Sequence, residues 1–222
     1  MVAIPTISCL LLWWLFFASN THITNKTQSI YIPTGTDFES LKSIVKPFLK
    51  NSTTFEWAAR VKRYHLNPKA GHYVLEQGMG NQKLINTLRA RNTEIEVVFN
   101  NQQTLAELAG RVAQQVEADS ISLLDAFNDE DFLKQLELKS DQALTLFIPN
   151  TYMMYWNTDA ASFAKRMAKE SARFWNQKRE TRRKTLNMTR AEVITLAAIV
   201  HQESRKADER PRVAGVYLNR LK

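Results

Sequence analysis

The sequence predicts an α+β protein with an apolar N-terminal helix, a small α+β module and a mostly helical second half. Residues 2–18 are almost wholly apolar, and residues 29–101 alternate short strand patterns with amphipathic helices. Helical patterns dominate from residue 102 onward. We therefore predict an anchor at 1–19, a linker at 20–28, a module at 29–101 and a larger domain at 102–222.

The composition indicates a globular chain, because 44% of its 222 residues are hydrophobic. Its 30 basic and 22 acidic residues give a net charge of +8, which suits nucleic acid, lipid headgroups or wall polymers without choosing among them. Cys9 is the one cysteine, so an intrachain disulfide is excluded. No metal-ligand spacing, Walker A pattern or GxGxxG occurs, so we expect no metal or cofactor.

The apolar stretch at 2–18 has three interpretations: a buried core helix, a cleaved signal peptide or a membrane anchor. Its length, about 17 residues, is at the short end for a membrane span. A core helix would have to cover four large aromatic side chains, Trp13, Trp14, Phe16 and Phe17. A signal peptide would need a basic start, which is absent. We therefore predict a single-pass anchor, with the rest of the chain facing outward.

The module at 29–101 follows the order strand, helix, helix, strand, helix, strand. Asp37 is expected to cap a helix that carries Phe38, Leu41 and Val45. The other expected elements are a strand over 29–33, a helix over 54–64, a strand over 72–76, a helix around Leu84 and Leu88, and a strand over 94–99.

The second half begins with a capping-box pattern, Thr104 followed by Glu107, that opens a helix to about residue 117. Two short helices should flank the acidic stretch 125–131, and a long helix is expected over 159–183. Residues 144–152 are expected to form a buried strand leading into a loop. The loop residues either have no further role or present hydrogen-bond donors and a stacking ring to a sugar; they are Asn150, Thr151 and Tyr152.

The stretch 189–204 is predicted to be one helix around which the second half is organised. Thr189 followed by Glu192 is a second capping box, and apolar residues recur at the spacing of one helix face, at Val193, Leu196, Ala197 and Val200. Glu203 falls at the edge of this apolar face. Pro211 then suits the start of a final helix, with Val213, Val216, Tyr217 and Leu221 on its buried side. The sequence stops inside that helix, so we expect the natural protein to continue.

Glu203 is the candidate catalytic residue. Carboxylates are rarely buried without a partner, and partial burial disfavours the charged form and raises the pKa, which is what a general acid needs. The structural alternative is that the helix frays by this point. Glu203 would then lie in solvent or pair with Arg205 or Lys206.

The string 197–221 resembles the signature of the YceG-like endolytic murein transglycosylases (the MltG family). It contains Ile199-Val200-x-x-Glu203, then Glu209-Arg210, Val213-Ala-x-Val216 and Asn219-Arg-Leu221. Two further segments are similar to family motifs in the same order: Lys69-Ala-Gly-His-Tyr73 and Phe147-Ile-Pro-Asn-Thr-Tyr152. The resemblance spans nearly the whole chain.

The resemblance implies cleavage of the β-1,4 bond between N-acetylmuramic acid and N-acetylglucosamine within peptidoglycan strands, leaving 1,6-anhydro ends. It places the general acid, later the base, at Glu203. Many family members carry a second Glu where this chain has His201, and an Asp where it has Asn150. The substrate-binding candidates are Asn150, Thr151, Tyr152, Ser204 and Asn219.

The resemblance also implies that the small module is LysM-like and that the helical half is a catalytic domain cut short at its C-terminus. The expected location is the inner cell membrane, with the catalytic part facing the periplasm or wall. The expected partners are peptidoglycan strands and the membrane, with peptidoglycan synthases as a further candidate and nucleic acid excluded.

Two other functions compete with a wall lyase. One is a non-catalytic glycan-binding scaffold, in which residues 69–73 hold sugar and Glu203 is structural. The other is a nucleic-acid binder, a hypothesis that rests on net charge alone.

Overall fold

The computed structural model describes residues 13–221, and the mixed α and β composition predicted from the sequence is confirmed. The strands are β1 (Thr27–Ile32), β2 (Gly71–Glu76), β3 (Glu94–Phe99) and β4 (Asn150–Tyr155). The helices are α2 (Phe38–Val45), α3 (Ser52–Val61), α4 (Asn81–Ala90), α5 (Leu105–Ala113), α6 (Ser120–Phe127), α7 (Glu130–Gln135), α8 (Ala160–Phe174), α9 (Gln177–Thr185), α10 (Arg190–Glu203) and α11 (Arg210–Arg220), with a 3₁₀ segment η3 (Ser140–Leu146).

The chain divides into two compact units. Unit 1 contains the residues up to Val97 together with 115–118 and 151–158, and unit 2 contains 98–114, 119–150 and the residues from Asp159 onward. The division is not a single cut, because two short segments of the second half return to unit 1. The predicted domain limits at residues 29 and 102 stay predictions.

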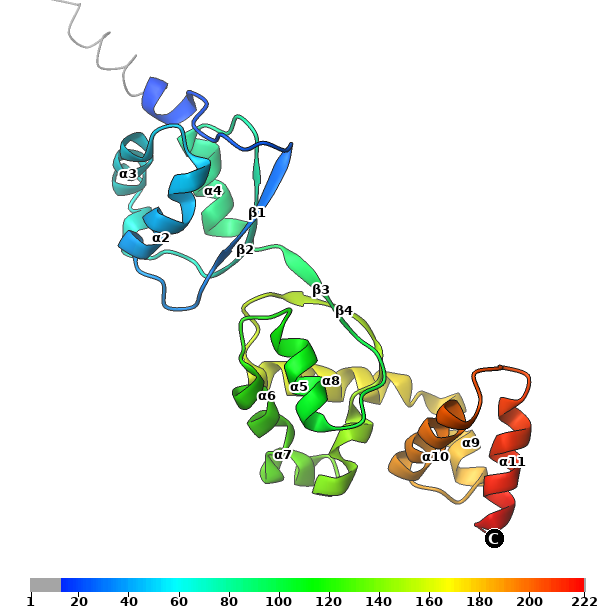
Figure 1. Cartoon of the computed structure of the whole chain (residues 1–222). Coiled ribbons are helices and arrows are strands. Elements are labelled where there is room, and N and C mark those ends of the chain that lie inside the picture. The colour runs from blue at the N-terminus through cyan, green and yellow to red at the C-terminus, as the bar shows by residue number, and fades with distance from the viewer. Residues whose placement is uncertain (1–12, 222) are drawn as a thin grey trace, which may run out of the picture. The chain divides into compact units, whose positions relative to one another are not determined.

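Unit 1 packs α2, α3 and α4 to one side of the β1–β2 sheet (Figure 1). The strands are antiparallel, in register from Thr27 opposite Glu76 to Ile32 opposite Gly71. Ile30 and Ile32 of β1 are buried while Tyr31 between them is exposed, because successive strand residues point to opposite faces. Asp37 caps α2 as predicted, accepting a hydrogen bond from the Ser40 N–H at 2.7 Å.

The segment Lys69–Tyr73 is explained by packing. Gly71 has a φ of +142°, and a Cβ at this position would lie 2.4 Å from Oδ1 of Asn92. That same oxygen accepts a hydrogen bond from the His72 N–H at 3.0 Å. Tyr73 is buried and donates its hydroxyl proton to the Lys69 carbonyl at 3.0 Å, and burial raises its pKa to about 12. The Gly and the Tyr of this motif therefore hold β2 in place.

Residues 20–23, at the start of the predicted linker, are packed into unit 1. Asn20 is buried, and its amide donates to Oδ1 of Asn81 at 2.7 Å and to the carbonyl of Asn51 at 2.9 Å. Its Oδ1 accepts from the Asn51 N–H at 2.8 Å. Asn81 in turn donates to the Leu15 carbonyl at 2.8 Å. Composition predicted a linker here, but each of these buried amides has a hydrogen-bond partner.

The predicted N-terminal anchor is only partly described, since residues 1–12 lie outside the described residues. Residues 13–17 are helical, with Trp13, Trp14 and Phe17 exposed. Between residues 13 and 221, no helix has both the length and the apolar character needed to cross a membrane. The predicted membrane helix is therefore not found in that range.

Unit 2 has a core in which α6 packs against α5 and α8. Phe127 lies at its centre, with ring centroids 4.4 Å from Phe147 and 5.8 Å from Phe163. The capping residue Thr104 accepts from the Glu107 N–H at 3.1 Å, as predicted. The helix α5 ends at Ala113 rather than near 117. Glu117 is engaged outside the helix, because its N–H donates to the Trp156 carbonyl at 2.9 Å and its carboxylate accepts from the Thr34 hydroxyl at 2.7 Å.

Two sequence expectations in the second half were wrong. The long helix over 159–183 is two helices, broken where Asn176 leaves helical geometry to cap α9. In the segment 144–152 we expected a strand followed by a loop. Residues 144–146 instead end η3, and residues 150–152 begin β4. In β4, Tyr152 and Met154 are buried and alternate with exposed residues, a period of two that the strand imposes.

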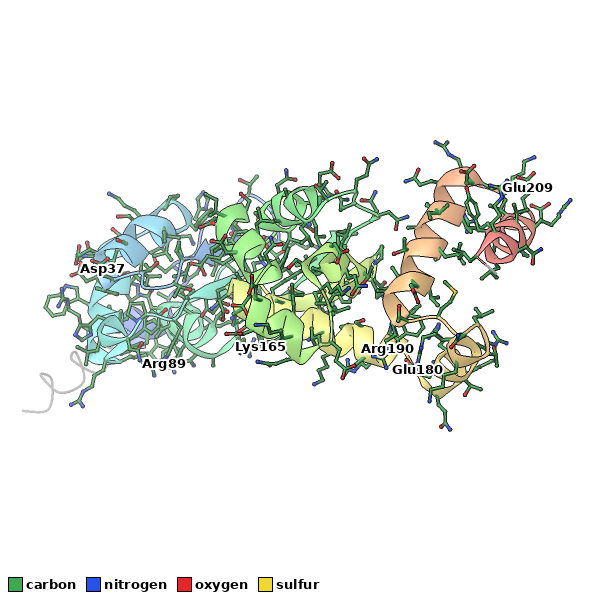
Figure 2. The ribbon with its side chains drawn as sticks, turned by 90° about the horizontal axis from the view of Figure 1, so that it is seen from below. Asp37, Arg89, Lys165, Glu180, Arg190 and Glu209 are labelled. Atoms are coloured by element: carbon green, nitrogen blue, oxygen red, sulfur yellow. The ribbon has the colours of Figure 1, made fainter. Side chains whose placement is uncertain are left out.

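The last three helices, α9, α10 and α11, are linked by ion pairs and helix contacts. Glu180 of α9 pairs with Arg183 at 3.0 Å and with Arg190 at the start of α10, and Figure 2 shows Glu180 and Arg190 beside one another. The helix α10 contacts η3 and α11, so it is attached to the rest of unit 2 at its sides.

Replacing Asn20 with Ala should destabilise unit 1, because the Asn51 N–H and the Asn81 amide lose their buried partner. We expect a loss of about 1–3 kcal/mol in the free energy of unfolding, measured by urea denaturation followed by circular dichroism. Asn25→Ala, at an exposed position of the same segment, is the control. Equal midpoints for the two variants would contradict the network.

Replacing Thr189 with Ala should remove the cap of α10. We expect a loss of about 1 kcal/mol, read from the thermal unfolding curve. Thr195→Ala, an exposed position inside the same helix, should change stability little because Ala suits a helix interior. An unchanged curve for Thr189→Ala would argue against the cap.

Candidate active site

The helix α10 ends at the predicted catalytic residue. Its start is fixed by a complete capping box, in which the Thr189 N–H donates to Oε2 of Glu192 at 2.6 Å and the Glu192 N–H donates to Oγ1 of Thr189 at 3.2 Å. Ala191 and Val200 are its buried residues, whereas Ala197, predicted on the buried face, is exposed. The helical geometry continues through Glu203, so the helix does not fray before it.

The carboxylate of Glu203 is exposed, and the predicted partial burial is wrong. Its Oε1 accepts a hydrogen bond from the Tyr217 hydroxyl of α11 at 3.0 Å. Glu203 is the last residue of its helix, so the apolar face that was expected to cover it has already ended. The pairing with Arg205 or Lys206, considered as an alternative, is not found in the described part of the chain; Lys206 pairs with Glu209 at 3.4 Å.

The contact with Glu203 changes the titration of Tyr217. The hydrogen bond to the carboxylate, together with partial desolvation, raises the pKa of the phenol above its ordinary value of 10.0. The phenol keeps its proton at neutral pH and donates a hydrogen bond to the carboxylate. A donor in this position orients one carboxylate oxygen.

Ser204 forms the turn that brings Tyr217 to Glu203. It is buried, its hydroxyl donates to Oε2 of Glu209 at 2.8 Å, and it accepts from the Lys206 N–H at 3.1 Å. Its carbonyl accepts from Nε of Arg210 at 3.3 Å. The hydroxyl of this predicted substrate-binding residue is thus engaged inside the protein.

A groove lies on the His201 and Gln202 side of the α10 end, within unit 2. It has a volume of about 510 Å³ and is lined by Asn100, Asn101, Pro149, His201, Gln202 and Arg205. Nδ1 of His201 lies 3.4 Å from Nη2 of Arg210. Glu203 follows Gln202 directly in α10, but it is not one of the residues that line the groove.

The other predicted substrate-binding residues lie on other elements than Glu203, three of them in β4 and one on α11. Asn150 and Thr151 are exposed at the start of β4, and Tyr152 is buried beside them. Thr151 and Tyr152 belong to unit 1, whereas Glu203 belongs to unit 2. Asn219 is exposed on α11, two residues after Tyr217 and so about 200° around the helix from it.

Sequence reasoning missed two parts of the site. Tyr217 was assigned only to the buried side of the last helix, and Asn100 and Asn101 were given no role. The spacing of Tyr217 from Glu203 depends on the turn at Ser204, which no local pattern predicts. Among residues 13–221, no group of three His, Cys, Asp or Glu side chains is placed to hold a metal ion.

The chain belongs to the YceG-like family, whose model matches residues 30–222. The resemblance noted in the sequence is therefore confirmed. The chain is 23% identical over 218 residues to an endolytic murein transglycosylase of Bacillus subtilis (strain 168), covering 88% of this chain and 59% of that protein. It is 24% identical over 229 residues to the endolytic murein transglycosylase of Streptococcus pneumoniae serotype 2 (strain D39), covering 89% of this chain and 41% of that protein.

A crystal structure of a YceG-like protein from Listeria monocytogenes is similar in fold, with a TM-score of 0.53 and 21% identity. The match covers 88% of this chain and 70% of that one. The chain thus spans about half the length of the curated relatives it matches, between 41% and 59%.

The contact between Glu203 and Tyr217 can be tested by titration. In Glu203→Gln the pKa of Tyr217 should fall toward 10.0, because the amide carries no negative charge. The raised pKa also means that this contact stabilises the fold below about pH 10 and is lost as the pH rises through the folded-state pKa. The midpoint is measured by NMR with labelled tyrosine, with Asp208→Asn as the control. An unmoved midpoint in Glu203→Gln would rule the contact out.

Proposed function

We propose that the chain is the catalytic part of an endolytic peptidoglycan lytic transglycosylase. The observation that carries the proposal is Glu203, an accessible carboxylate at the end of α10 that accepts a hydrogen bond from Tyr217; the two residues before it, His201 and Gln202, help to line a polar groove. Membership of the YceG-like family and the names of the two curated relatives support it. The substrate is the β-1,4 bond between N-acetylmuramic acid and N-acetylglucosamine.

The proposed mechanism needs one carboxylate. Protonated Glu203 gives its proton to the glycosidic oxygen as the bond from that oxygen to C1 breaks. The C6 hydroxyl of the same muramic acid attacks C1, and its proton passes to the Glu203 carboxylate. The product is a 1,6-anhydro ring, and the acid is regenerated without consuming water. Ordinary glycoside hydrolysis needs a second carboxylate to activate water or to attack C1, and this reaction does not.

Tyr217 acts in the second half of this cycle. Its hydroxyl donates to Oε1, which leaves Oε2 of Glu203 to exchange the proton with the sugar. General acid and base help of this kind is worth roughly 10²–10⁴-fold in rate. Exposure of Glu203 in the free protein is compatible with this role, because a bound sugar chain would itself displace water from the carboxylate.

The remaining predicted site residues keep different roles in the proposal. Asn150 and Asn219 carry exposed amides able to bond sugar hydroxyl or N-acetyl groups, and Thr151 and Tyr152 follow Asn150 in β4. Ser204 acts by positioning Glu203 rather than by touching substrate. The proposal also includes the N-terminal membrane anchor, the LysM-like nature of the small module and a location at the inner membrane facing the wall.

A non-catalytic glycan-binding function is a second candidate, and one observation in unit 1 favours it. Tyr31 is 45% exposed and its ring stacks on His72 at 4.9 Å and lies 5.1 Å from Trp156. An exposed aromatic ring of this kind, held by two further rings, suits the apolar face of a sugar ring. In this candidate the chain holds peptidoglycan without cutting it.

Glu203→Gln separates the two candidates. The variant keeps the shape of the side chain and its contact with Tyr217 but cannot supply the proton. Purified sacculi treated with the full chain should release products with new 1,6-anhydro ends, and the variant should release about 10²-fold less or none. Asp208→Asn, an exposed carboxylate five residues away, should release as much as the parent chain. Undiminished release by Glu203→Gln would overturn the assignment, and no release by the parent chain would favour the binding candidate.

A further inference from the structure

The groove that His201 and Gln202 help to line has a chemical bias that the proposed reaction does not require. Its lining contains a guanidinium, an imidazole and three side-chain amides, and none of the six lining residues carries a carboxylate. Cleavage of a neutral sugar chain would need only hydroxyl and N-acetyl recognition, which amides provide.

Arg205 is the source of this bias. Its side chain is exposed, and no ion pair for it is found in the described part of the chain. Of the two acidic residues that follow it, Glu209 pairs with Lys206 at 3.4 Å and accepts from Ser204, and Asp208 is exposed without an ion pair to Arg205 in the described part of the chain. The carboxylate before it, Glu203, accepts from Tyr217. The cation at the groove is therefore available to an incoming anion.

The backbone around Arg205 is held in place. The Arg205 carbonyl accepts from Nη2 of Arg210 at 3.4 Å, and Ser204 before it is buried in the turn. Asn101 and Gln202 add amides with no partner in the described part of the chain, and Pro149 adds a flat apolar surface. Amides, a flat apolar surface and a planar guanidinium together suit a sugar that carries a carboxylate, because Arg binds carboxylates through two parallel hydrogen bonds.

We propose that the groove of Asn100, Asn101, Pro149, His201, Gln202 and Arg205 is a subsite for an acidic glycan unit, with Arg205 binding its carboxylate. The placement of the glycan rests on the proposed function. In that placement, the acidic sugar unit in the groove neighbours the glycosidic bond on which Glu203 acts. The carboxylate has two sources in peptidoglycan, the lactyl group of muramic acid where no peptide is attached, and the acidic groups of the attached peptide.

Binding to defined tetrasaccharides tests this subsite. The full chain carrying Glu203→Gln is titrated with four probes: alternating glucosamine–muramic acid tetrasaccharide with free lactyl groups, the same compound with those groups converted to methyl amides, the peptide-bearing tetrasaccharide, and neutral chitotetraose. Arg205→Ala should weaken binding of a carboxylate-bearing probe by about tenfold, the usual size for a charge-assisted hydrogen bond, and that of chitotetraose by less than about twofold. The probe that loses affinity identifies the carboxylate.

Three controls make the result decisive. Arg205→Lys should keep part of the affinity, since it retains the charge without the paired geometry. Arg182→Ala removes an exposed arginine of α9, outside the groove, and should leave all affinities unchanged. Circular dichroism confirms that each variant is folded. Equal loss for chitotetraose and the acidic probes, or no loss for any probe, would overturn the subsite.

The outcome separates the subsite from the proposed function. If Glu203→Gln abolishes release of anhydro ends while Arg205→Ala binds every probe normally, the reaction stands and the subsite is wrong. If Arg205→Ala loses affinity for an acidic probe while Glu203→Gln cuts sacculi normally, the subsite stands and the catalytic assignment is wrong.

Discussion

The hydrogen bond from Ser204 to Glu209 is the constraint on which the candidate site depends. It closes the turn between α10 and α11, with the Lys206 N–H and the Arg210 side chain as additional partners of Ser204. Because the turn is closed, α11 runs back beside α10 and Tyr217 reaches Glu203 across fourteen residues of sequence. Without it, Glu203 would be a freely rotating side chain at a helix end, and its carboxylate would have no fixed direction relative to the groove.

The family signature in this chain separates into residues that hold the fold and residues that can do chemistry. Gly71 and Tyr73 hold the edge of β2, the first through a close approach to Asn92 and the second through a buried hydroxyl. Ser204 belongs to the same group, although its sequence position next to Glu203 suggested substrate contact. Glu203 and the groove residues are accessible to a ligand. Position in a motif thus does not distinguish the two roles, and burial does.

Local signals predicted the elements well and tertiary relations poorly. The caps at Asp37, Thr104 and Thr189 were predictable because a cap and its partner lie within three residues of each other. The strand over 94–99 was predictable from alternation. The packing of residues 20–23 and the strand β4 were not, because each is decided by partners far away in the sequence. The exposure of Glu203 was not either, because the exact end of a helix is hard to predict. Asn20 looks like a linker residue until Asn51 and Asn81 are placed beside it, and Glu203 looks half-buried until the helix ends there.

The amide network around Asn20 has a mechanical consequence. Asn51 caps α3 and Asn81 begins α4, so any tension applied to the chain before residue 20 reaches the ends of two helices at once. Several buried hydrogen bonds must then break together. If the force acted instead at Thr27, the first residue of β1, then β1 and β2 would separate one residue pair at a time. The network therefore prevents a force applied before residue 20 from acting directly on the β1–β2 sheet.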